Sequence, residues 1–350
     1  MTVAPTAVPA ASPDDEEVFD ALADAHAFYR SQVRGSWVPD HLNRRNLYPQ
    51  LEPAGIGYAP DGWTTLTAAL HRRGHTPTAL EAAGLARRTS AGRLVDVFRD
   101  RLMVPLTDAG GQLVGFTGRR APTAGDDIPK YLNSPTSPVF NKHQVLYGLA
   151  EDADRLRRGA MPVLVEGPLD RLAVTQGSRT LAVVGVAPCG TALTADQVAA
   201  LIAVTGLRRP IAVALDPDPA GRAATLRGWQ LLTAAGATHL RHVALPDGQD
   251  PADLIRQGRG DQLRTAITRH RPLAIAVADH RITAAGPTRD WTAALRLGRH
   301  ILTQDLPHVP SGDVAAYLAH LARRLQLDPA TITAAAADTV STPHALTTDT

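Results

Sequence analysis

The sequence predicts an α/β protein with additional α+β character, built from three consecutive subdomains. Residues 151–256 alternate short apolar runs with helical patterns, which is typical of a parallel sheet covered by helices. Residues 18–150 mix helical and strand patterns in no regular order, whereas residues 257–338 contain helical patterns only. We therefore expect a mixed α/β N-terminal subdomain, a parallel-sheet α/β subdomain and a C-terminal helical bundle.

The composition excludes the membrane-spanning and disulfide-rich classes of protein. Of the 350 residues, 44% are apolar and 20% are charged, and Cys189 is the only cysteine, so neither an internal disulfide nor a cysteine-based zinc site is expected. No apolar stretch is long enough to span a membrane, and residues 1–17 lack the pattern of a signal peptide. We expect a cytoplasmic protein in which residues 1–17 and 339–350 are disordered tails.

The N-terminal subdomain is expected to contain helices first and strands later. Apolar residues from Val18 to Tyr29 recur at spacings of three and four, and Pro39 fits the first turn of a second helix. Further predicted elements are a strand at 56–63, helices at 64–73 and 77–83, and strands at 93–98, 102–107 and 113–118. Residues 119–142 include four prolines and form a long irregular stretch, which is typical of a functional loop. Trp63 and Phe140 are expected in the core.

The second and third subdomains are predicted from their changing periodicity. The α/β part is expected to contain helices at 151–159, from 168, at 194–204 and at 220–235, with strands at 163–166, 180–184, 211–215 and 239–245. After Asp253 we expect helices at 252–257, 261–268, 272–282, 288–302, 311–326 and 328–336, and no strands.

Acidic residues end three of the predicted strands. Glu166 follows one apolar run, Asp216 and Asp218 follow a second, and Asp250 closes a third strand-to-helix turn. Because open α/β sheets bind ligands at the carboxyl ends of their strands, we expect these carboxylates to lie together. Such oxygens suit Mg²⁺, and a two-metal nucleotidyl transfer would need several of them. Each aspartate could instead be a helix N-cap, an alternative that is less favoured for three successive turns than for one.

Other residues near these turns have more modest predicted roles. Asp170, four positions after Glu166, is either an ordinary helix-face acid or a supporting residue of the site. Asp247 and Asp253 are expected to shape the third turn and cap its helix. Gly167 and Gly221 would allow a phosphate to approach the backbone closely.

A second group of candidate residues is basic. Only two of the 36 basic residues are lysine, Lys130 and Lys142, and they lie twelve positions apart. Their proximity indicates selected positions, although chance remains an alternative reading. Arg99, Arg101 and Arg119 lie next to the predicted strands that precede the two lysines, and such cations can neutralise nucleic-acid phosphates along a groove.

Five motifs occur in an order that is similar to the catalytic core of bacterial DnaG-type primases. In this chain they read V-F-R-D-R-L-M-V-P from Val97, G-F-T-G-R from Gly115, P-K-Y-L-N-S-P from Pro129, L-Y-G-L from Leu146 and E-G-P-L-D from Glu166. The last motif, with D-P-D-P-A-G from Asp216, also resembles the TOPRIM domain. The ordered series, rather than any single motif, carries the resemblance over residues 19–338.

The resemblance implies template-directed synthesis of RNA primers on single-stranded DNA from ribonucleoside triphosphates, with Mg²⁺ or Mn²⁺ and without zinc. It implies that Glu166 and Asp170 are catalytic. It implies that metal is held by Glu166, Asp216, Asp218 and Asp250. It further implies a ridge that guides the template and binds nucleotide, made of Arg99, Arg101, Arg119, Lys130, Asn133 and Lys142, with Tyr131 and Asn133 also fixing the loop.

The chain departs from this family in four ways. It shows neither an N-terminal zinc-binding module nor a C-terminal helicase-binding domain, so a replicative helicase or a separate zinc-module protein is a possible partner. Pro217 and Pro219 interrupt the second acidic turn and remove amide donors that could contact phosphate. Ala252 occupies the position of a family carboxylate in the third turn. An accessory, plasmid-type or phage-type primase would fit these departures.

Two other functions stay open at this point. A TOPRIM nuclease would need the acidic turns but not the basic block at 93–142, which argues against it. A degenerate core that binds single-stranded DNA or a replication protein without catalysis is favoured by Pro217, Pro219 and Ala252.

Overall fold

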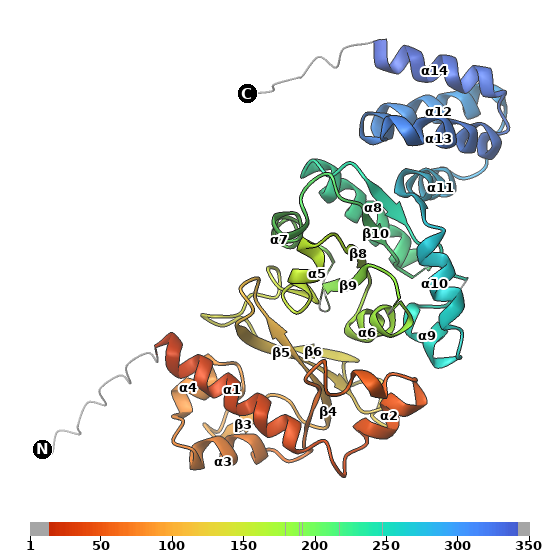
Figure 1. Ribbon diagram of the computed structural model, residues 1–350. Helices are drawn as coiled ribbons and strands as arrows, with labels where there is room; N and C mark the ends of the chain where they lie inside the picture. The colour runs from red at the N-terminus through yellow and green to blue at the C-terminus, as the bar shows by residue number, and fades with distance from the viewer. Residues whose placement is uncertain are drawn as a thin grey trace, which may run out of the picture.

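The computed structural model describes residues 14–178, 180–188, 190, 192–216, 218–246 and 248–341. Figure 1 shows three lobes in a row, from the N-terminal helices and strands (red to yellow) through a central sheet (green) to the C-terminal helices (blue). The sequence predictions that concern Cys189, Pro217, Asp247 and most of both tails fall outside the described residues.

The N-terminal lobe is built around a four-stranded antiparallel sheet with the strand order β1-β4-β5-β6. A separate hairpin pairs β2 with β3. The elements of this lobe are α1 (Asp15–Ser31), α2 (Val38–Arg44), η1 (Tyr48–Gln50), β1 (Gly57–Ala59), α3 (Thr65–Arg72), α4 (Pro77–Ala82), β2 (Ala86–Arg88), β3 (Leu94–Asp96), β4 (Arg101–Thr107), β5 (Leu113–Arg120) and β6 (Tyr131–Asn133).

Two predictions about the backbone of this lobe need correction. The stretch 119–142 is not wholly irregular, because β6 lies within it and pairs with β5 in the register Arg119↔Tyr131. Prolines on both sides of this three-residue strand left no periodicity to detect. The N-terminal tail also ends earlier than residue 17, since α1 begins at Asp15, where the Asp14 side chain caps it by accepting from the Glu17 amide at 2.9 Å.

The central lobe is a six-stranded sheet with the order β12-β11-β10-β8-β9-β7. The four inner strands are parallel, whereas β7 and β12 pair antiparallel at the two edges. Its elements are β7 (Leu146–Tyr147), α5 (Ala153–Arg157), β8 (Met161–Leu164), α6 (Pro168–Gly177), β9 (Val183–Pro188), α7 (Ala195–Thr205), β10 (Ile211–Val213), α8 (Pro219–Ala234), β11 (Leu240–His242) and α9 (Pro251–Arg256). The strand predicted at 180–184 therefore lies a few residues later, at β9.

The C-terminal lobe is helical, but the prediction that no strand follows Asp253 is wrong. β12 (Arg271–Pro272) completes the central sheet by pairing with β11, and two residues are too few for a periodic signal. The remaining elements are α10 (Gly260–Thr268), α11 (Leu273–Ala285), α12 (Trp291–Asp305), η2 (Leu306–His308), α13 (Ser311–Leu325) and α14 (Pro329–Ser341). Because α14 reaches Ser341, residues 339–341 are helical rather than part of a disordered tail.

Packed cores connect the lobes. On one face of the central sheet, side chains of β8 and α6 such as Val163 and Leu172 share a cluster with Leu102 and Val104 of β4. On the opposite face, α7 and α8 contribute to a second cluster that extends into α11 and α13, where Tyr317 is fully buried. The N-terminal lobe is thus held against the sheet by shared apolar burial, which fixes the cleft between them.

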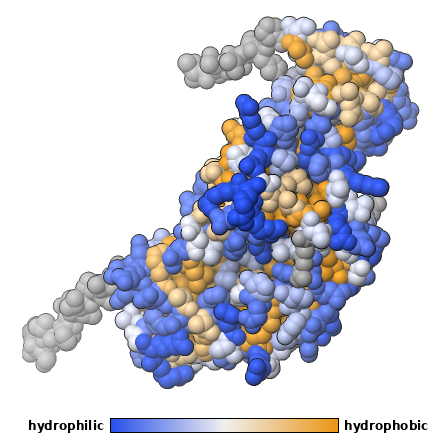
Figure 2. All heavy atoms as spheres, viewed as in Figure 1, coloured by the Kyte–Doolittle hydropathy of each residue, from blue (hydrophilic) through white to orange (hydrophobic). Residues whose placement is uncertain are grey.

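The surface is mostly hydrophilic on the face shown in Figure 2, with apolar residues more frequent over the C-terminal helices. Within the described part of the chain, no helix has both the length and the apolar character needed to cross a bilayer.

Close packing of α1 on β1 yields a stability prediction. A Cβ atom added to Gly57 would lie 2.5 Å from Tyr29 Cβ and 2.8 Å from the Tyr29 carbonyl carbon, so Gly57→Ala should destabilise the fold by about 1–3 kcal/mol through overpacking. The measurement is thermal unfolding followed by circular dichroism. Gly312→Ala is the matched control, because nothing lies within 4 Å of its added Cβ. Equal midpoints for the two variants would contradict the packing described.

Candidate active site

The three acidic turns meet at one edge of the central sheet. β8, β10 and β11 are adjacent in the strand order, and Glu166, Asp216 and Asp250 follow their carboxyl ends. The Asp216 amide donates to Glu166 Oε1 at 3.1 Å, which ties the first turn to the second. The parallel order of the strands therefore brings together carboxylates that are far apart in the sequence.

Two of the predicted metal ligands also cap helices. Asp218 Oδ1 accepts from the Gly221 amide at 2.7 Å at the start of α8, and Asp250 Oδ1 accepts from the Asp253 amide at 2.5 Å at the start of α9. Each cap uses one oxygen of the carboxylate. The capping alternative raised from the sequence is therefore present, and it fixes the orientation of each carboxylate without using its second oxygen.

Asp170 links α6 to the third acidic turn. It lies in the first turn of α6, and its Oδ1 accepts from the Ala252 amide at 3.3 Å. Asp253, which follows Ala252 in the sequence, also lines the pocket. Its Oδ1 accepts from the Arg256 guanidinium at 2.9 Å. Ala252, which stands at the position of a family carboxylate, thus supplies a backbone donor to Asp170.

The electrostatics of this edge are those of crowded like charges. Burial, followed by the nearby Glu166 and Asp250 carboxylates, raises the pKa of Asp216 to about 7. Burial, followed by the carboxylates of Asp250, Asp216 and Glu166, raises the pKa of Asp170 as well. Desolvation also raises the pKa of Glu166, against the hydrogen bond from the Asp216 amide. Cations placed at this edge would relieve the repulsion.

The carboxylates fit Mg²⁺ or Mn²⁺ in donor type, although they do not form a closed cage. Among the described residues, no three His, Cys, Asp or Glu side chains are grouped closely enough to enclose an ion. Mg²⁺ commonly keeps several waters and binds through one or two carboxylates together with substrate phosphates. The hard oxygens of Glu166, Asp216 and Asp250 match that open mode of binding.

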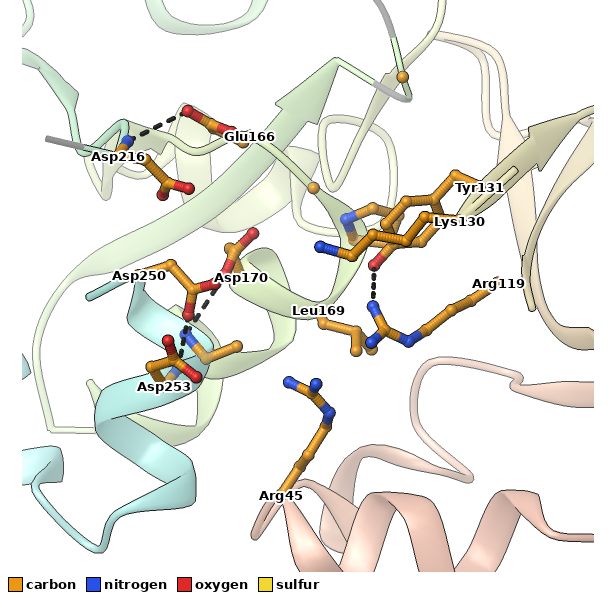
Figure 3. Close-up of a pocket in the computed structure, with 14 residues that line it drawn as sticks. Arg45, Arg119, Lys130, Tyr131, Glu166, Leu169, Asp170, Asp216, Asp250 and Asp253 are labelled. Atoms are coloured by element: carbon orange, nitrogen blue, oxygen red, sulfur yellow. Dashed lines mark hydrogen bonds between the residues drawn. The ribbon is translucent and has the colours of Figure 1, made fainter. Parts of the chain in front are cut away.

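A cationic wall faces these acids across a pocket of about 360 Å³. Figure 3 shows Glu166, Asp170, Asp216 and Asp250 on one side and Arg45, Arg119 and Lys130 on the other. Arg119 Nη1 donates to the Tyr131 hydroxyl at 3.1 Å, so β6 holds this guanidinium in place. Since the acids come from the central lobe and the cations from the N-terminal lobe, the pocket exists only where the lobes meet.

Arg45 is a pocket residue that the sequence analysis missed. It follows the last residue of α2. The nearby carboxylates of Asp250 and Asp253 favour the charged form of its guanidinium. Burial, followed by repulsion from Arg119, lowers the pKa of Arg45. Nothing in the sequence distinguished it from the many other arginines, because α2 is distant in sequence from every acidic motif.

A second groove, of about 810 Å³, runs along the N-terminal lobe. The prediction that Trp63 belongs to the core is wrong, because its side chain is 57% exposed and stacks under the Arg99 guanidinium at 3.4 Å. Arg101 lines the same groove but is buried, with Nη1 donating to the Gly118 and Pro129 carbonyls. The prediction for Phe140 is confirmed, since it is buried.

The two remaining ridge residues, Asn133 and Lys142, are not among the described residues that line the acidic pocket. Asn133 lines the second groove, and its Nδ2 would contact a Cβ atom added to Gly190 at 3.0 Å. The Lys142 carbonyl accepts from Gln197 Nε2 at 3.1 Å. The phosphate-binding roles of Asn133, Arg101 and Lys142 therefore stay predictions.

In the second acidic turn, the backbone of Gly221 packs closely against the backbone of Asp216. A Cβ atom at Gly221 would lie 2.0 Å from the Asp216 carbonyl oxygen, so this glycine is required by the turn itself as much as by any ligand. Pro219 is the first residue of α8, a position where the amide proton has no intrahelical partner in any case.

Comparisons with known proteins agree with the fold and the site. Residues 28–153 match the family described as "DNA primase catalytic core, N-terminal domain", and residues 163–255 match "Toprim-like". A DNA primase from Deinococcus radiodurans is 37% identical over 253 residues, which are 72% of this chain and 43% of that protein. The chain thus spans less than half the length of this curated relative.

Two solved structures show the same architecture. The RNA polymerase domain of Mycobacterium tuberculosis primase DnaG, in complex with double-stranded DNA carrying a 6-nucleotide overhang, superposes with a TM-score of 0.75 at 27% identity, covering 90% of this chain and 99% of that chain. A DnaG primase catalytic domain bound to single-stranded DNA gives a TM-score of 0.70 at 28% identity, covering 90% and 98%.

The fold and site are those of a TOPRIM-containing protein whose acidic sheet edge faces a cationic lobe. Within that class, the ordered motifs, the two matched regions and the solved structures agree on one assignment. The chain belongs to the DnaG-type primase family and contains its catalytic core.

Substitutions at Asp250 separate metal binding from helix capping. Asp250→Asn keeps a good N-cap but removes the charge, so it should lower Mn²⁺ affinity about tenfold or more with little effect on stability. Asp250→Ala should lose the same affinity and about 1 kcal/mol of stability. Mn²⁺ binding by electron paramagnetic resonance and thermal unfolding measure the two effects.

Asp290→Asn is the matched control for this test, because Asp290 caps α12 outside the pocket. It should change neither Mn²⁺ affinity nor stability. Unchanged Mn²⁺ affinity in Asp250→Asn would show that Asp250 is a helix cap only.

Proposed function

We propose that this chain synthesises short RNA primers on a single-stranded DNA template from ribonucleoside triphosphates. The observation that carries the proposal is the pocket in which Glu166, Asp216 and Asp250 face Arg45, Arg119 and Lys130. A nucleoside triphosphate and its metal ions carry the matching charges, with phosphates for the cations and divalent metal for the carboxylates.

In this proposal the cationic wall binds and orients the triphosphate of the incoming nucleotide. Arg119, held by the Tyr131 hydroxyl, presents its guanidinium without having to be ordered first. Glu166, Asp216, Asp218 and Asp250 would hold Mg²⁺, which would stabilise the negative charge that develops during nucleotidyl transfer. Mn²⁺ would suit the same donors.

Glu166 is the candidate to position the attacking 3′-hydroxyl and accept its proton, since its carboxylate lies at the sheet edge beside Asp216, and desolvation, which raises its pKa, makes it a stronger base. The bond from the 3′-oxygen to the α-phosphorus forms, the bond from the α-phosphorus to the bridging oxygen breaks, and pyrophosphate leaves. Asp170, half-buried beside these acids and held by the Ala252 amide, would keep the third turn in position.

The groove along the N-terminal lobe suits the template strand. Trp63 offers an exposed ring for base stacking, and Arg99 lies directly over that ring, where it can contact a phosphate. Sequence-tolerant binding of this kind is what template tracking requires. A replicative helicase or a zinc-module protein as partner, and a cytoplasmic location, stay predictions from the sequence.

Primer synthesis on single-stranded DNA, with labelled ribonucleotides and Mg²⁺ or Mn²⁺, tests the proposal. Wild-type protein should yield RNA oligomers, and Glu166→Gln should abolish them because it removes a carboxylate from the sheet edge. Cleaved template would support a nuclease instead. Tight DNA binding with no product under any metal would support a non-catalytic protein and contradict the proposal.

The template groove yields a prediction about how binding depends on salt. Trp63→Ala should weaken single-stranded DNA binding by about 1–3 kcal/mol, as expected for a lost stacking platform, with no change in the salt slope. Arg99→Ala should instead reduce the slope of log K against log salt concentration by about 0.7. Fluorescence anisotropy at several salt concentrations measures both. Wild-type affinity in Trp63→Ala would place the template elsewhere.

A further inference from the structure

The junction after helix α2 contains a contact that neither the motifs nor the proposed chemistry explains. Asn46, immediately after the pocket residue Arg45, has a φ of 53° in the left-handed region. Its backbone amide donates to the Asn43 carbonyl at 2.9 Å, which closes the end of α2. Asparagine tolerates this conformation better than most residues, yet glycine would serve the backbone equally well.

The Asn46 side chain reaches across to the central lobe. Its Nδ2 donates to the carbonyl oxygens of Ile255 at 3.0 Å and of Arg256 at 3.3 Å, more than 200 residues later in the sequence. Both carbonyls belong to the last turn of α9, where the Ile255 carbonyl also accepts from the Gly258 amide at 3.0 Å. The Arg256 carbonyl is thereby given a donor from the opposite side of the cleft.

Helix α9 connects this contact to the acidic edge. Asp250 caps one end of the helix, and Asn46 binds the other end. The six residues of α9 span only about 9 Å. A shift of its C-terminal end, where Asn46 binds, would therefore also move its N-terminal end, where Asp250 lies. Arg45 is covalently next to the anchor, and Figure 3 shows its guanidinium facing the acidic side of the pocket.

We infer that Asn46 is a positioning residue that sets the distance between Arg45 and the acidic edge by anchoring the end of α2 to the end of α9. The inference rests on the proposed function, because it assigns Arg45 to the triphosphate. In this inference, the side-chain amide of Asn46 keeps Arg45 at a fixed distance from the acidic residues of the pocket.

Asn46→Gly is the informative variant, because glycine keeps the left-handed backbone and removes only the side-chain amide. Loss of this hydrogen-bonding group should raise the KM for ribonucleoside triphosphate about fivefold in primer synthesis, with kcat nearly unchanged. Asn46→Asp should raise KM further, since a carboxylate faces two carbonyl oxygens. Thermal unfolding should change little in Asn46→Gly.

Thr107→Val is the matched control. It removes another hydrogen bond between the lobes, from Thr107 Oγ1 to Glu151 Oε1 at 3.0 Å, without touching α2 or α9. KM should stay at the wild-type value in this variant. An equal rise in KM in both variants would assign the effect to general loosening of the lobes and overturn the inference.

A double-mutant cycle tests whether Asn46 acts through Arg45. In the Arg45→Ala background, Asn46→Gly should cause no further rise in KM, because the cation that it positions is gone. Additive effects would contradict the inference.

Amide hydrogen exchange separates failure of the inference from failure of the proposed function. The backbone amides of residues 252–256 should exchange faster in Asn46→Gly than in wild type or Thr107→Val, whether or not the protein makes primers. If no primers form but exchange rises, the anchor is real and the proposed function fails. Unchanged exchange overturns the anchor itself.

Discussion

The structure depends on one electrostatic constraint, the crowding of carboxylates at the ends of three adjacent parallel strands. Glu166, Asp216 and Asp250 are brought together by strand order, and burial and mutual repulsion raise the pKa of Asp216 to about 7. Such an arrangement is unfavourable unless cations complete it. The cationic wall that faces these acids comes from a different lobe, so the relative placement of the lobes becomes part of the site.

That placement is held by two kinds of contact. Apolar burial between β4 and the face of the sheet that carries α6 provides most of the attraction, while hydrogen bonds such as the one from Asn46 to α9 select a particular arrangement. The groove that contains Trp63 and Arg99 lies on the same lobe as the cationic wall. A template bound there and a nucleotide bound by the cationic wall would therefore both contact the N-terminal lobe.

Much of the fold and of the acidic side of the site could be predicted from the sequence, for physical reasons that differ between elements. The acids at the ends of β8, β10 and β11 were recognisable because each follows an apolar run and parallel strands end at one edge. β12 and β6 were missed because two or three residues carry no period. Arg45 was missed because its importance depends on the docking of α2 against α9, a long-range contact without a local signal. Trp63 was misplaced because an aromatic residue after a strand is usually buried, and only the structure shows a ring that stays largely exposed with Arg99 stacked on one face.

The most direct test of the account is a crystal structure with Mn²⁺ and a ribonucleoside triphosphate, in which anomalous scattering locates the metal. Mn²⁺ should bind carboxylates among Glu166, Asp216 and Asp250, with the triphosphate extending toward Arg45, Arg119 and Lys130. Mn²⁺ and triphosphate located elsewhere on the protein, with the pocket between the lobes containing only solvent, would contradict it.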